Sequence, residues 1–384
     1  MVAAVRRGQS LRAVAEKFAV GVATVAHWVE RAQGQRLDRA DFSDHSRAPH
    51  KTRRTDPSLE DLVLQTRREL AHGDLGAIGA EAIHQALLVR QVAKVPSVRT
   101  INRILRRRGA LDGRQRTRRP PPPTGWYLPD VAEALAELDS IDIVEGLVIK
   151  DGPHIEVLNA VSLHGGLTAS WPVESPVTSE RTVEALVEHW RAVGLPNYAQ
   201  FDNDMIFHGT HRYPDALGRV LRLCLSLGVV PVLVPPRETG FQAMIESYNG
   251  WWQAKVWSRF QHADLEGLQE RSQRYVAALR KQRAARLEAA PERRVFPSDW
   301  KLDLKKRPGG RLVYLRRSNG NSEVVLLGQS WPLGQVWPNR LVRCEVDLDH
   351  DKLRFFTLRR KEPTSQPQIL EVAYRLPARG FQDG

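Results

Sequence analysis

Three acidic residues stand where strands and a helix could bring their carboxylates together. Asp142 lies in residues 138–144, whose alternating pattern predicts a strand, and Asp202 directly follows the short segment 198–201. Glu246 lies on the polar face of an amphipathic helix. Any one of these acids alone is usually solvated surface, but clustered carboxylates raise one another's pKa and need cations nearby. Because Mg²⁺ favours carboxylates together with substrate phosphate oxygens, the three acids predict a divalent metal site.

The helix that carries Glu246 must be fixed by its apolar face. It follows a predicted buried strand at residues 230–234, which Pro235 and Pro236 end because proline cannot donate to the ladder. We predict that the core-facing residues are Met244, Tyr248, Trp251, Trp252 and Val256. The opposite face is predicted to hold Gln242, Glu246, Asn249, Gly250 and Gln253.

Asp139 is the alternative to Asp142, since both lie in the same predicted strand. Side chains alternate between the two faces of a strand, and residues three apart therefore point in opposite directions. Only one of the two aspartates can face the metal.

A mixed sheet with helices is predicted to hold the acids. Strands are expected at residues 140–144, 155–162, 167–172, up to Asp202, and at 230–234, with helices at 179–193 and 214–227. Three antiparallel strands followed by alternating strands and helices form a mixed α/β domain. A nucleotide-binding α/β domain is set aside because no Gly-rich phosphate loop follows a strand.

This order of residues resembles the catalytic core of retroviral-type integrases and of insertion-sequence transposases of the DDE class. The residues that carry the resemblance are Asp142, Asp202-Asn203, Gln242, Glu246, Ser247 and Asn249. It covers about residues 135–260 and implies an RNase H-like fold. It also implies that Asp142, Asp202 and Glu246 are catalytic and hold two Mg²⁺ or Mn²⁺ ions that cut and join DNA.

Some positions depart from the family pattern. Asp204 stands where Gly is common, and Gly250 and Gln253 stand where the family often has Lys. The resemblance implies that Gln242 contacts the DNA end. Lys255 is the candidate that would substitute for the family's lysines at the positions of Gly250 and Gln253.

Charge is unevenly distributed along the 384 residues. The net charge is +13, divided as +12 for residues 1–125, −8 for 126–260 and +9 for 261–384. Because an acidic segment repels a phosphate backbone, we expect the two flanks to supply most DNA contacts. Arginine-rich faces that are merely solvated would give the same totals.

The two cysteines, Cys224 and Cys344, are too few for a disulfide framework, which favours a reducing compartment. No apolar run approaches the ~20 residues of a membrane span. We therefore expect a bacterial cytoplasmic protein that is nucleoid-associated when bound to DNA.

Residues 1–39 are predicted to form a helix-turn-helix. Two short amphipathic helices, at residues 11–18 and 22–29, are separated by a tight turn. Thr24 and His27 lie on the outer side of the second helix, where they could contact bases in the major groove. The alternative is that the two helices pack together without DNA.

A second helix-turn-helix is predicted at residues 58–112, after a polar linker at 40–57. Its helices are expected at residues 59–70, 80–89 and 97–108. Ser97 is a plausible N-cap of the last helix and Gly109 a plausible stop. The arginines on its outer face are Arg99, Arg103, Arg106, Arg107 and Arg108, and we expect the first four to contact DNA unless the face is only solvated.

The remaining chain divides by composition. Residues 113–128 join a basic run to four prolines and predict an extended linker, or less plausibly a ligand of a proline-binding domain. Residues 129–262 are the predicted core and 263–300 a helical connector. Residues 301–363 are predicted to form a small SH3-like barrel that binds DNA or another subunit, or only stabilises the core, and 364–384 form a tail. The strands of this barrel are expected at residues 311–315, 323–327, 341–347 and 353–358.

The expected fold is thus multidomain, with N-terminal all-α helix-turn-helix units, an α/β RNase H-like core and a C-terminal all-β barrel. The expected function is that of a DNA transposase or integrase that binds transposon end repeats and catalyses strand cleavage and transfer. Its expected partners are double-stranded DNA, as transposon end and target, and further copies of the chain; an accessory ATPase is left open. The alternative is a non-catalytic DNA-binding regulator or assembly factor that keeps the fold.

Overall fold

The computed structural model describes residues 1–44, 55–111, 124–209, 213, 215–238, 240–334 and 337–378. They fall into two units, residues 1–60 and 61–384, which are described separately. The centre of the predicted linker at 40–57 and most of the one at 113–128 lie outside the described residues. Within them, no helix combines the length and the apolar character that crossing a membrane requires.

The first unit is built on three short helices, α1 (Val2–Arg6), α2 (Leu11–Lys17) and α3 (Val22–Arg31). Ser10 caps α2 because its side chain accepts a hydrogen bond from the amide of Ala13. The fully buried centre is small, consisting mainly of Val14, Ala15 and Val25. Phe18 and Val22, which the sequence placed on the packed faces, are exposed instead.

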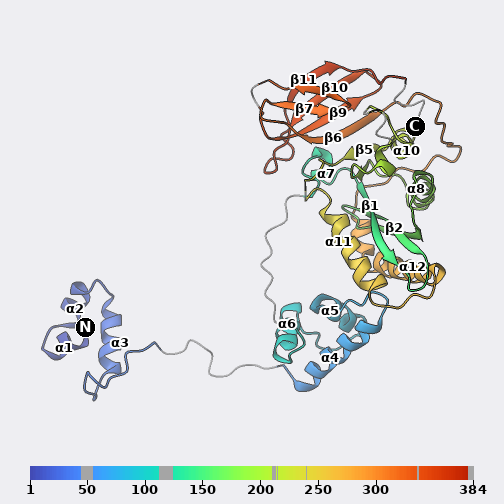
Figure 1. Ribbon diagram of the computed structural model, residues 1–384. Coiled ribbons are helices and arrows are strands. Elements are labelled where there is room, and N and C mark those ends of the chain that lie inside the picture. Colours follow the sequence, from blue (N-terminus) through green and yellow to red (C-terminus); the bar gives the residue numbers. More distant parts are fainter. Residues whose placement is uncertain are drawn as a thin grey trace. The chain divides into compact units, whose positions relative to one another are not determined.

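A second helical group, α4 (Pro57–His72), α5 (Ala80–Val89) and α6 (Val98–Arg107), matches the predicted helices closely (Figure 1). Ser97 accepts from the amide of Thr100 at the start of α6, and Gly109 ends the helix with φ +64°, as predicted. Ile101, Ile104 and Leu105 of α6 pack on α5. The opposite side of α6 therefore remains available to solvent.

The α/β part of the second unit carries the acidic residues. Its elements are α7 (Pro129–Ala132), β1 (Leu138–Val148), β2 (His154–Ser162), β3 (Thr168–Glu174), α8 (Ser179–Val193), β4 (Tyr198–Phe201), α9 (Met205–His208), α10 (Arg219–Ser226), β5 (Val230–Leu233), α11 (Ala243–Trp252), the π-helical turn η1 (Gln253–Trp257), α12 (Leu265–Gln282) and α13 (Ala284–Glu288). The strand order is β3-β2-β1-β4-β5, with β1, β2 and β3 antiparallel and with β4 and β5 parallel to β1. This mixed α/β order is compatible with the expected RNase H-like core.

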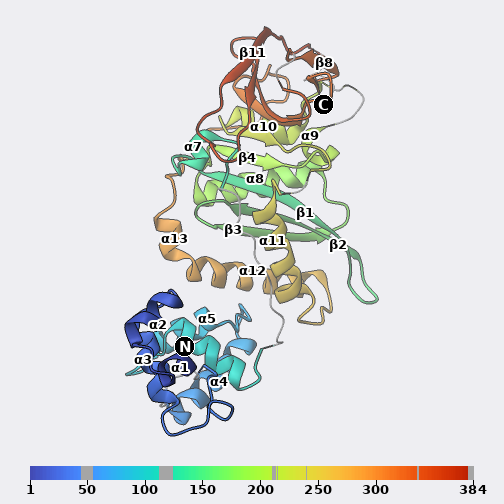
Figure 2. The same ribbon diagram turned by 90° about the vertical axis from the view of Figure 1, so that its left-hand side faces the viewer.

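Helices cover both faces of this sheet. Trp190 of α8 and Leu221 of α10 pack with Ile141 on one face. On the other face, Tyr248 and Trp252 of α11 pack against Val157, and Figure 2 shows α11 crossing β1 and β2. The acids are thus placed by a rigid, two-sided core.

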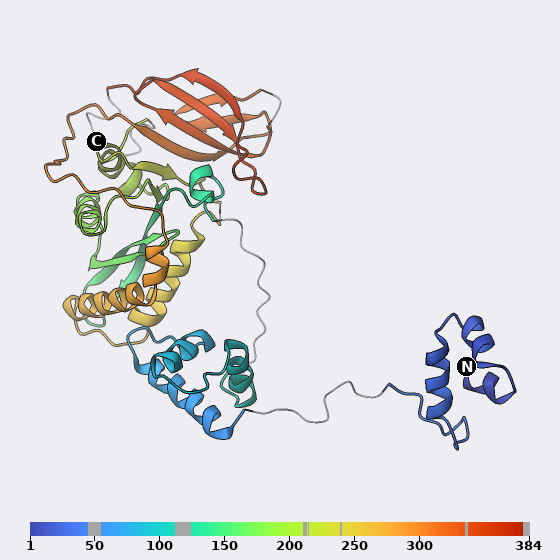
Figure 3. The same cartoon turned by 180° about the vertical axis from the view of Figure 1, so that it is seen from behind.

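The C-terminal strands are β6 (Arg311–Arg317), β7 (Glu323–Leu326), β8 (Gln329–Pro332), β9 (Leu341–Asp347), β10 (Lys352–Thr357) and β11 (Gln368–Ala373). β6 pairs in parallel with β5 through Val232↔Val313 and Leu233↔Tyr314, so that β6, β9, β10 and β11 continue the core sheet to nine strands (Figure 3). β7 and β8 form a separate hairpin. The sequence predicts a separate barrel for this region. A closed SH3-like barrel stays a prediction, whereas the continuous nine-stranded sheet was not predicted.

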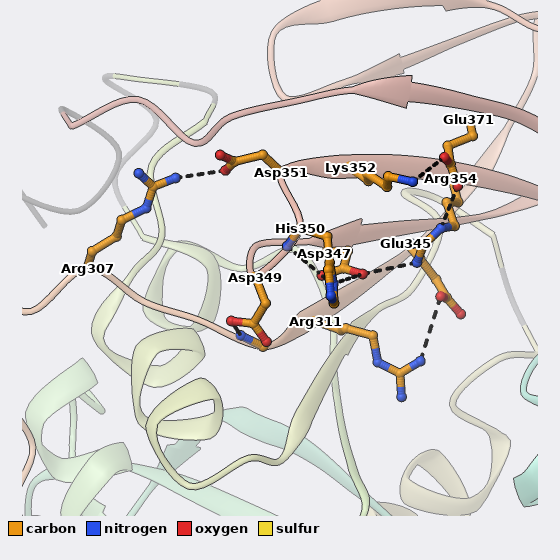
Figure 4. A network of polar contacts seen from close by, with 11 residues as sticks. Arg307, Arg311, Glu345, Asp347, Asp349, His350, Asp351, Lys352, Arg354 and Glu371 are labelled. Atoms are coloured by element: carbon orange, nitrogen blue, oxygen red, sulfur yellow. Dashed lines mark hydrogen bonds and ion pairs between the residues drawn. The ribbon is translucent and has the colours of Figure 1, made fainter.

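Ion pairs hold these strands together. Arg354 bridges Asp347 of β9 and Glu371 of β11, at 3.1 Å and 2.8 Å, and Arg311 of β6 lies 3.8 Å from Glu345 of β9 (Figure 4). Part of the positive charge that was expected to attract DNA is therefore paired with carboxylates within the sheet.

Candidate active site

Strand register brings two of the acids together. β1 and β4 are parallel neighbours with Ser140 opposite Gln200. Asp142 and Asp202 each lie two residues beyond that pair, and the two aspartates therefore lie at the same level along neighbouring strands. Asp202 itself directly follows the end of β4.

The third acid, Glu246, is carried by α11, which packs across β1 and β2. The helix is fixed by Ile245, Tyr248 and Trp252, all fully buried. The Tyr248 hydroxyl lies 2.7 Å from Ser170 Oγ of β3, and Trp252 Nε1 donates to Ser272 Oγ of α12 at 2.9 Å. Glu246 is exposed, and among the described residues its carboxylate has no hydrogen bond or ion pair.

The predicted face of this helix was partly wrong. Trp251 was expected in the core but is 48% exposed, and Ile245, which was not named, takes a core position. Asn249 was expected on the polar face opposite the core and is buried. The helix is therefore rotated relative to the prediction, so that Asn249 is buried and Trp251 is exposed.

Asn249 is turned inward because it binds the acid site. Its Nδ2 donates to Asp142 Oδ2 at 2.8 Å, and its Oδ1 accepts from Asn159 Nδ2 at 2.9 Å. Asn159 lies opposite Asp142 on β2 and is fully buried. This chain of amides fixes the orientation of Asp142. Asn159 was missed; an amide in the middle of the otherwise apolar run 157–161 is the signal that could have found it.

The pKa of Asp142 reflects both its burial and the two other carboxylates. Burial raises the pKa of Asp142 to about 6, and the charges of Asp202 and then Glu246 contribute to the increase. Burial also raises the pKa of Asp202, with a further increase from the charge of Asp204. The site is therefore short of positive charge, as a cation-binding site should be.

Asp139, the alternative to Asp142, lies in different surroundings. It is buried and binds Arg293 through both carboxylate oxygens, at 2.9 Å and 2.7 Å, and accepts from Trp190 Nε1 at 3.0 Å. Burial alone would raise the pKa of Asp139, but the guanidinium outweighs it and holds that pKa below its ordinary value. Asp139 is neutralised within the chain and is not part of the acid cluster.

The turn after Asp202 has its own local order. Asp202 Oδ1 accepts from the amide of Asp204 at 2.9 Å, and Asp204 Oδ1 in turn accepts from the amide of Ile206, capping α9. Asp204 is thus the N-cap of α9. Asn203 Nδ2 donates to Val234 O at 2.7 Å, which ties the turn to the end of β5.

The donor set suits a hard cation, since every side chain offers carboxylate oxygen. Among the described residues, no group of three or more His, Cys, Asp or Glu side chains is close enough to hold a metal ion as it stands.

The predicted DNA-contacting residues lie on three elements. Thr24 and His27 are exposed on α3, and Arg99, Arg103, Arg106 and Arg107 are exposed on α6. Arg108 of the same helix pairs with Asp61 of α4 at 2.6 Å. These positions agree with outward-facing helices, and their contacts with DNA stay predictions.

The other two candidates, Gln242 and Lys255, flank the Glu246 helix. Gln242 precedes α11, and its buried Nε2 has no hydrogen-bond partner within the described part of the chain. Lys255 in η1 donates to Gly76 O at 2.9 Å, while Arg259 donates to Ala71 O and Gly73 O at 2.7 Å and 2.8 Å. Lys255 is therefore engaged with the turn after α4 in this structure.

Comparisons with known proteins found weak likenesses. No family model and no curated protein matches the chain. Among solved structures, it is similar to a chain of the simian T-cell lymphotropic virus intasome in complex with PP2A regulatory subunit B56 gamma, with 13% identity, TM-score 0.34, and coverage of 77% of this chain and 95% of that one.

The chain is also similar to the catalytic core domain of BIV integrase, with 15% identity, TM-score 0.26, and coverage of 37% of this chain and 82% of that one. A third similar structure is the HTLV-2 integrase catalytic core domain in complex with magnesium, in a dimeric form. The identity is 14%, the TM-score is 0.27, and the match covers 37% of this chain and 84% of that one. Likenesses at these scores do not establish a family.

Proposed function

We propose that the chain is a polynucleotidyl transferase of the DDE type, a transposase or integrase that cleaves DNA strands and joins them to a target. The observation that carries the proposal is the position of Asp142, whose pKa is raised by burial and then by Asp202 and Glu246, and whose carboxylate is held by Asn249. A structural acid has a cationic partner, as Asp139 has in Arg293. Asp142 has like charges as neighbours instead.

Such a site suits phosphoryl transfer with hard divalent ions. Asp142, Asp202 and Glu246 would hold two Mg²⁺ or Mn²⁺ ions, which supply activation of a water or a DNA 3′-hydroxyl and stabilisation of the leaving oxygen. The chain's own contribution is placement. β1 and β4 fix the aspartates side by side, Asn249 and Asn159 orient Asp142, and the exposed Glu246 completes the site from α11.

DNA is the substrate that the charge distribution supports. The segment 126–260 has nine Lys and Arg against 17 Asp and Glu, so most attraction for phosphates must come from elsewhere in the chain. The exposed arginines of α6 and the outer side of α3 are the proposed contacts with the transposon end. Binding of several copies to two DNA ends is part of the proposal.

The proposal is tested with Asp142→Asn, Asp202→Asn and Glu246→Gln. Each variant should reduce Mg²⁺- or Mn²⁺-dependent nicking of supercoiled plasmid DNA to the level of a protein-free control, while retention of labelled duplex DNA in a binding assay stays unchanged. Glu145→Gln is the matched control, because Glu145 is exposed on the same strand, β1, and should nick normally.

The test also separates the second candidate function. A wild-type protein that binds duplex DNA but never nicks it with either metal would support the non-catalytic regulator. Normal nicking by any one of the three variants would remove that residue from the site.

A further inference from the structure

A cation from the C-terminal strands reaches the turn that carries Asp202. Arg316 of β6 donates through Nη2 to Asn203 Oδ1 at 3.1 Å, and through Nη1 to Val234 O at 3.1 Å. Asn203 Nδ2 donates to the same Val234 carbonyl at 2.7 Å. The guanidinium, the amide and the end of β5 thus form one closed set of hydrogen bonds beside Asp202.

The same strand makes a second contact with this turn. The rings of Tyr314 on β6 and His208 on α9 lie 6.2 Å apart in an edge-on arrangement. The Arg316 guanidinium lies 5.0 Å from the centre of the Tyr314 ring. β6 is therefore in contact with the residue next to Asp202 and with α9, the helix that follows the turn.

The placement of Arg316 is costly for a residue that only fills space. Arg316 is half-buried, burial lowers its pKa, and within the described residues it pairs with no carboxylate. Its hydrogen bonds go to neutral oxygens of Asn203, Val234 and its own neighbour Leu315. A planar guanidinium can satisfy several acceptors at fixed angles at once, which a lysine ammonium does not match.

We infer that Arg316 is a positioning residue for the proposed active site, acting through Asn203 to hold the Asp202 carboxylate where the acid cluster needs it. The inference rests on the proposed function. The inference goes beyond the proposed function because the segment that contains all three acids does not include Arg316. That arginine comes from β6, a strand about eighty residues beyond β5.

The first test measures the turn directly, without DNA or metal. Arg316→Met should speed hydrogen–deuterium exchange at residues 203–209 by about tenfold or more, the ratio expected for one lost charge-assisted hydrogen bond. Arg311→Met is the matched control, because Arg311 lies on the same strand with an exposed side chain facing Glu345. It should leave exchange at 203–209 unchanged.

The second test measures cleavage. Arg316→Met should slow plasmid nicking by about 10²-fold, as expected for a misplaced reactive group, without weakening duplex binding. Arg316→Lys should recover part of the rate, because an ammonium can reach one of the two acceptors. If Arg316 acts through Asn203, the double variant Arg316→Met with Asn203→Ala should be no slower than the slower single variant.

The outcomes separate the two proposals. Unchanged exchange at 203–209 in Arg316→Met, or rate losses that multiply in the double variant, would overturn the positioning role. Asn203→Ala tests the same link without disturbing β6, should Arg316→Met fail to fold. A wild-type protein that never nicks DNA would instead contradict the proposed function, while the exchange result would still decide whether Arg316 holds the turn.

Discussion

The two faces of β1 place an aspartate in opposite surroundings. On one face, Asp139 is buried against Arg293 and its pKa is held below the ordinary value. On the other, three residues along the strand, Asp142 lies beside Asp202 and Glu246 and its pKa is raised to about 6. Asp139 thus has a cationic partner within the chain, whereas Asp142 has carboxylates as neighbours and is the acid that we propose binds a cation.

The largest expected effect is on the structural face. Asp139→Asn should lower the free energy of unfolding by about 3–5 kcal/mol, because it leaves the Arg293 guanidinium buried without its carboxylate. Chemical denaturation measures the difference. The change Asp142→Asn should leave the free energy of unfolding equal or higher. Equal losses in both variants would contradict the difference between the two aspartates.

The next effect is a pH dependence of opposite sign at the two sites. The folded-state pKa of Asp142 lies above its unfolded value, so its protonated form stabilises the fold at low pH and this contribution is lost as pH rises from about 4 to about 6. The full difference is about 3 kcal/mol.

Asp139 has a folded-state pKa below its unfolded value, and its contribution is present above about pH 4 and is lost as pH falls. Denaturation of the metal-free wild type and of Asp142→Asn across pH 4–7 separates the contribution of Asp142 from that of Asp139. The difference between the proteins should grow as pH rises through this window; a constant difference would contradict it.

A smaller effect is expected from adding Mg²⁺. At a Mg²⁺ concentration ten times its dissociation constant, the ion should stabilise the wild type by about 1.4 kcal/mol. Thermal unfolding with and without Mg²⁺ measures this at pH 7. Asp142→Asn should gain less, whereas Glu145→Gln should respond as the wild type does.

The smallest effect extends the same distinction to arginines. Arg283 of the connector donates to Gly166 O at 2.8 Å and Arg280 to Thr168 O at 2.8 Å, so both serve the turn between β2 and β3. Arg103 of α6 is exposed. Arg103→Ala should change the free energy of unfolding by no more than about 0.5 kcal/mol yet weaken duplex binding, while Arg280→Ala should do the reverse. Paired measurements of unfolding and DNA retention decide between them.

Local patterns predicted most of the elements. The helix at 179–193 and the strand at 341–347 were predicted with the observed boundaries, because each has a clear period and clear ends. β8 and β11 were missed. β8 is four residues long, ends in Pro332 and has mostly exposed side chains, which leaves almost no strand pattern.

Long-range features were harder to predict. The pairing of β5 with β6 joins segments about eighty residues apart, and neither carries a local signal for the other. The inward turn of Asn249 depends on Asn159 and Asp142 as partners, which a helical period does not reveal. Trp251 could lie outward because Arg283 lies over its ring, 5.7 Å from the centre.

The pairing of β6 with β5 also bears on how the chain folds. Until β6 has been synthesised, β5 is an edge strand whose Val232 and Leu233 backbone groups have no neighbour on that side. Pro231 lies just before the pairing begins and has no N–H to offer a foreign strand. A ribosome-bound chain that ends soon after α11 would hold all three acids and yet present an open sheet edge. Completion of the sheet, and with it the contact from Arg316, is a late folding event with high contact order.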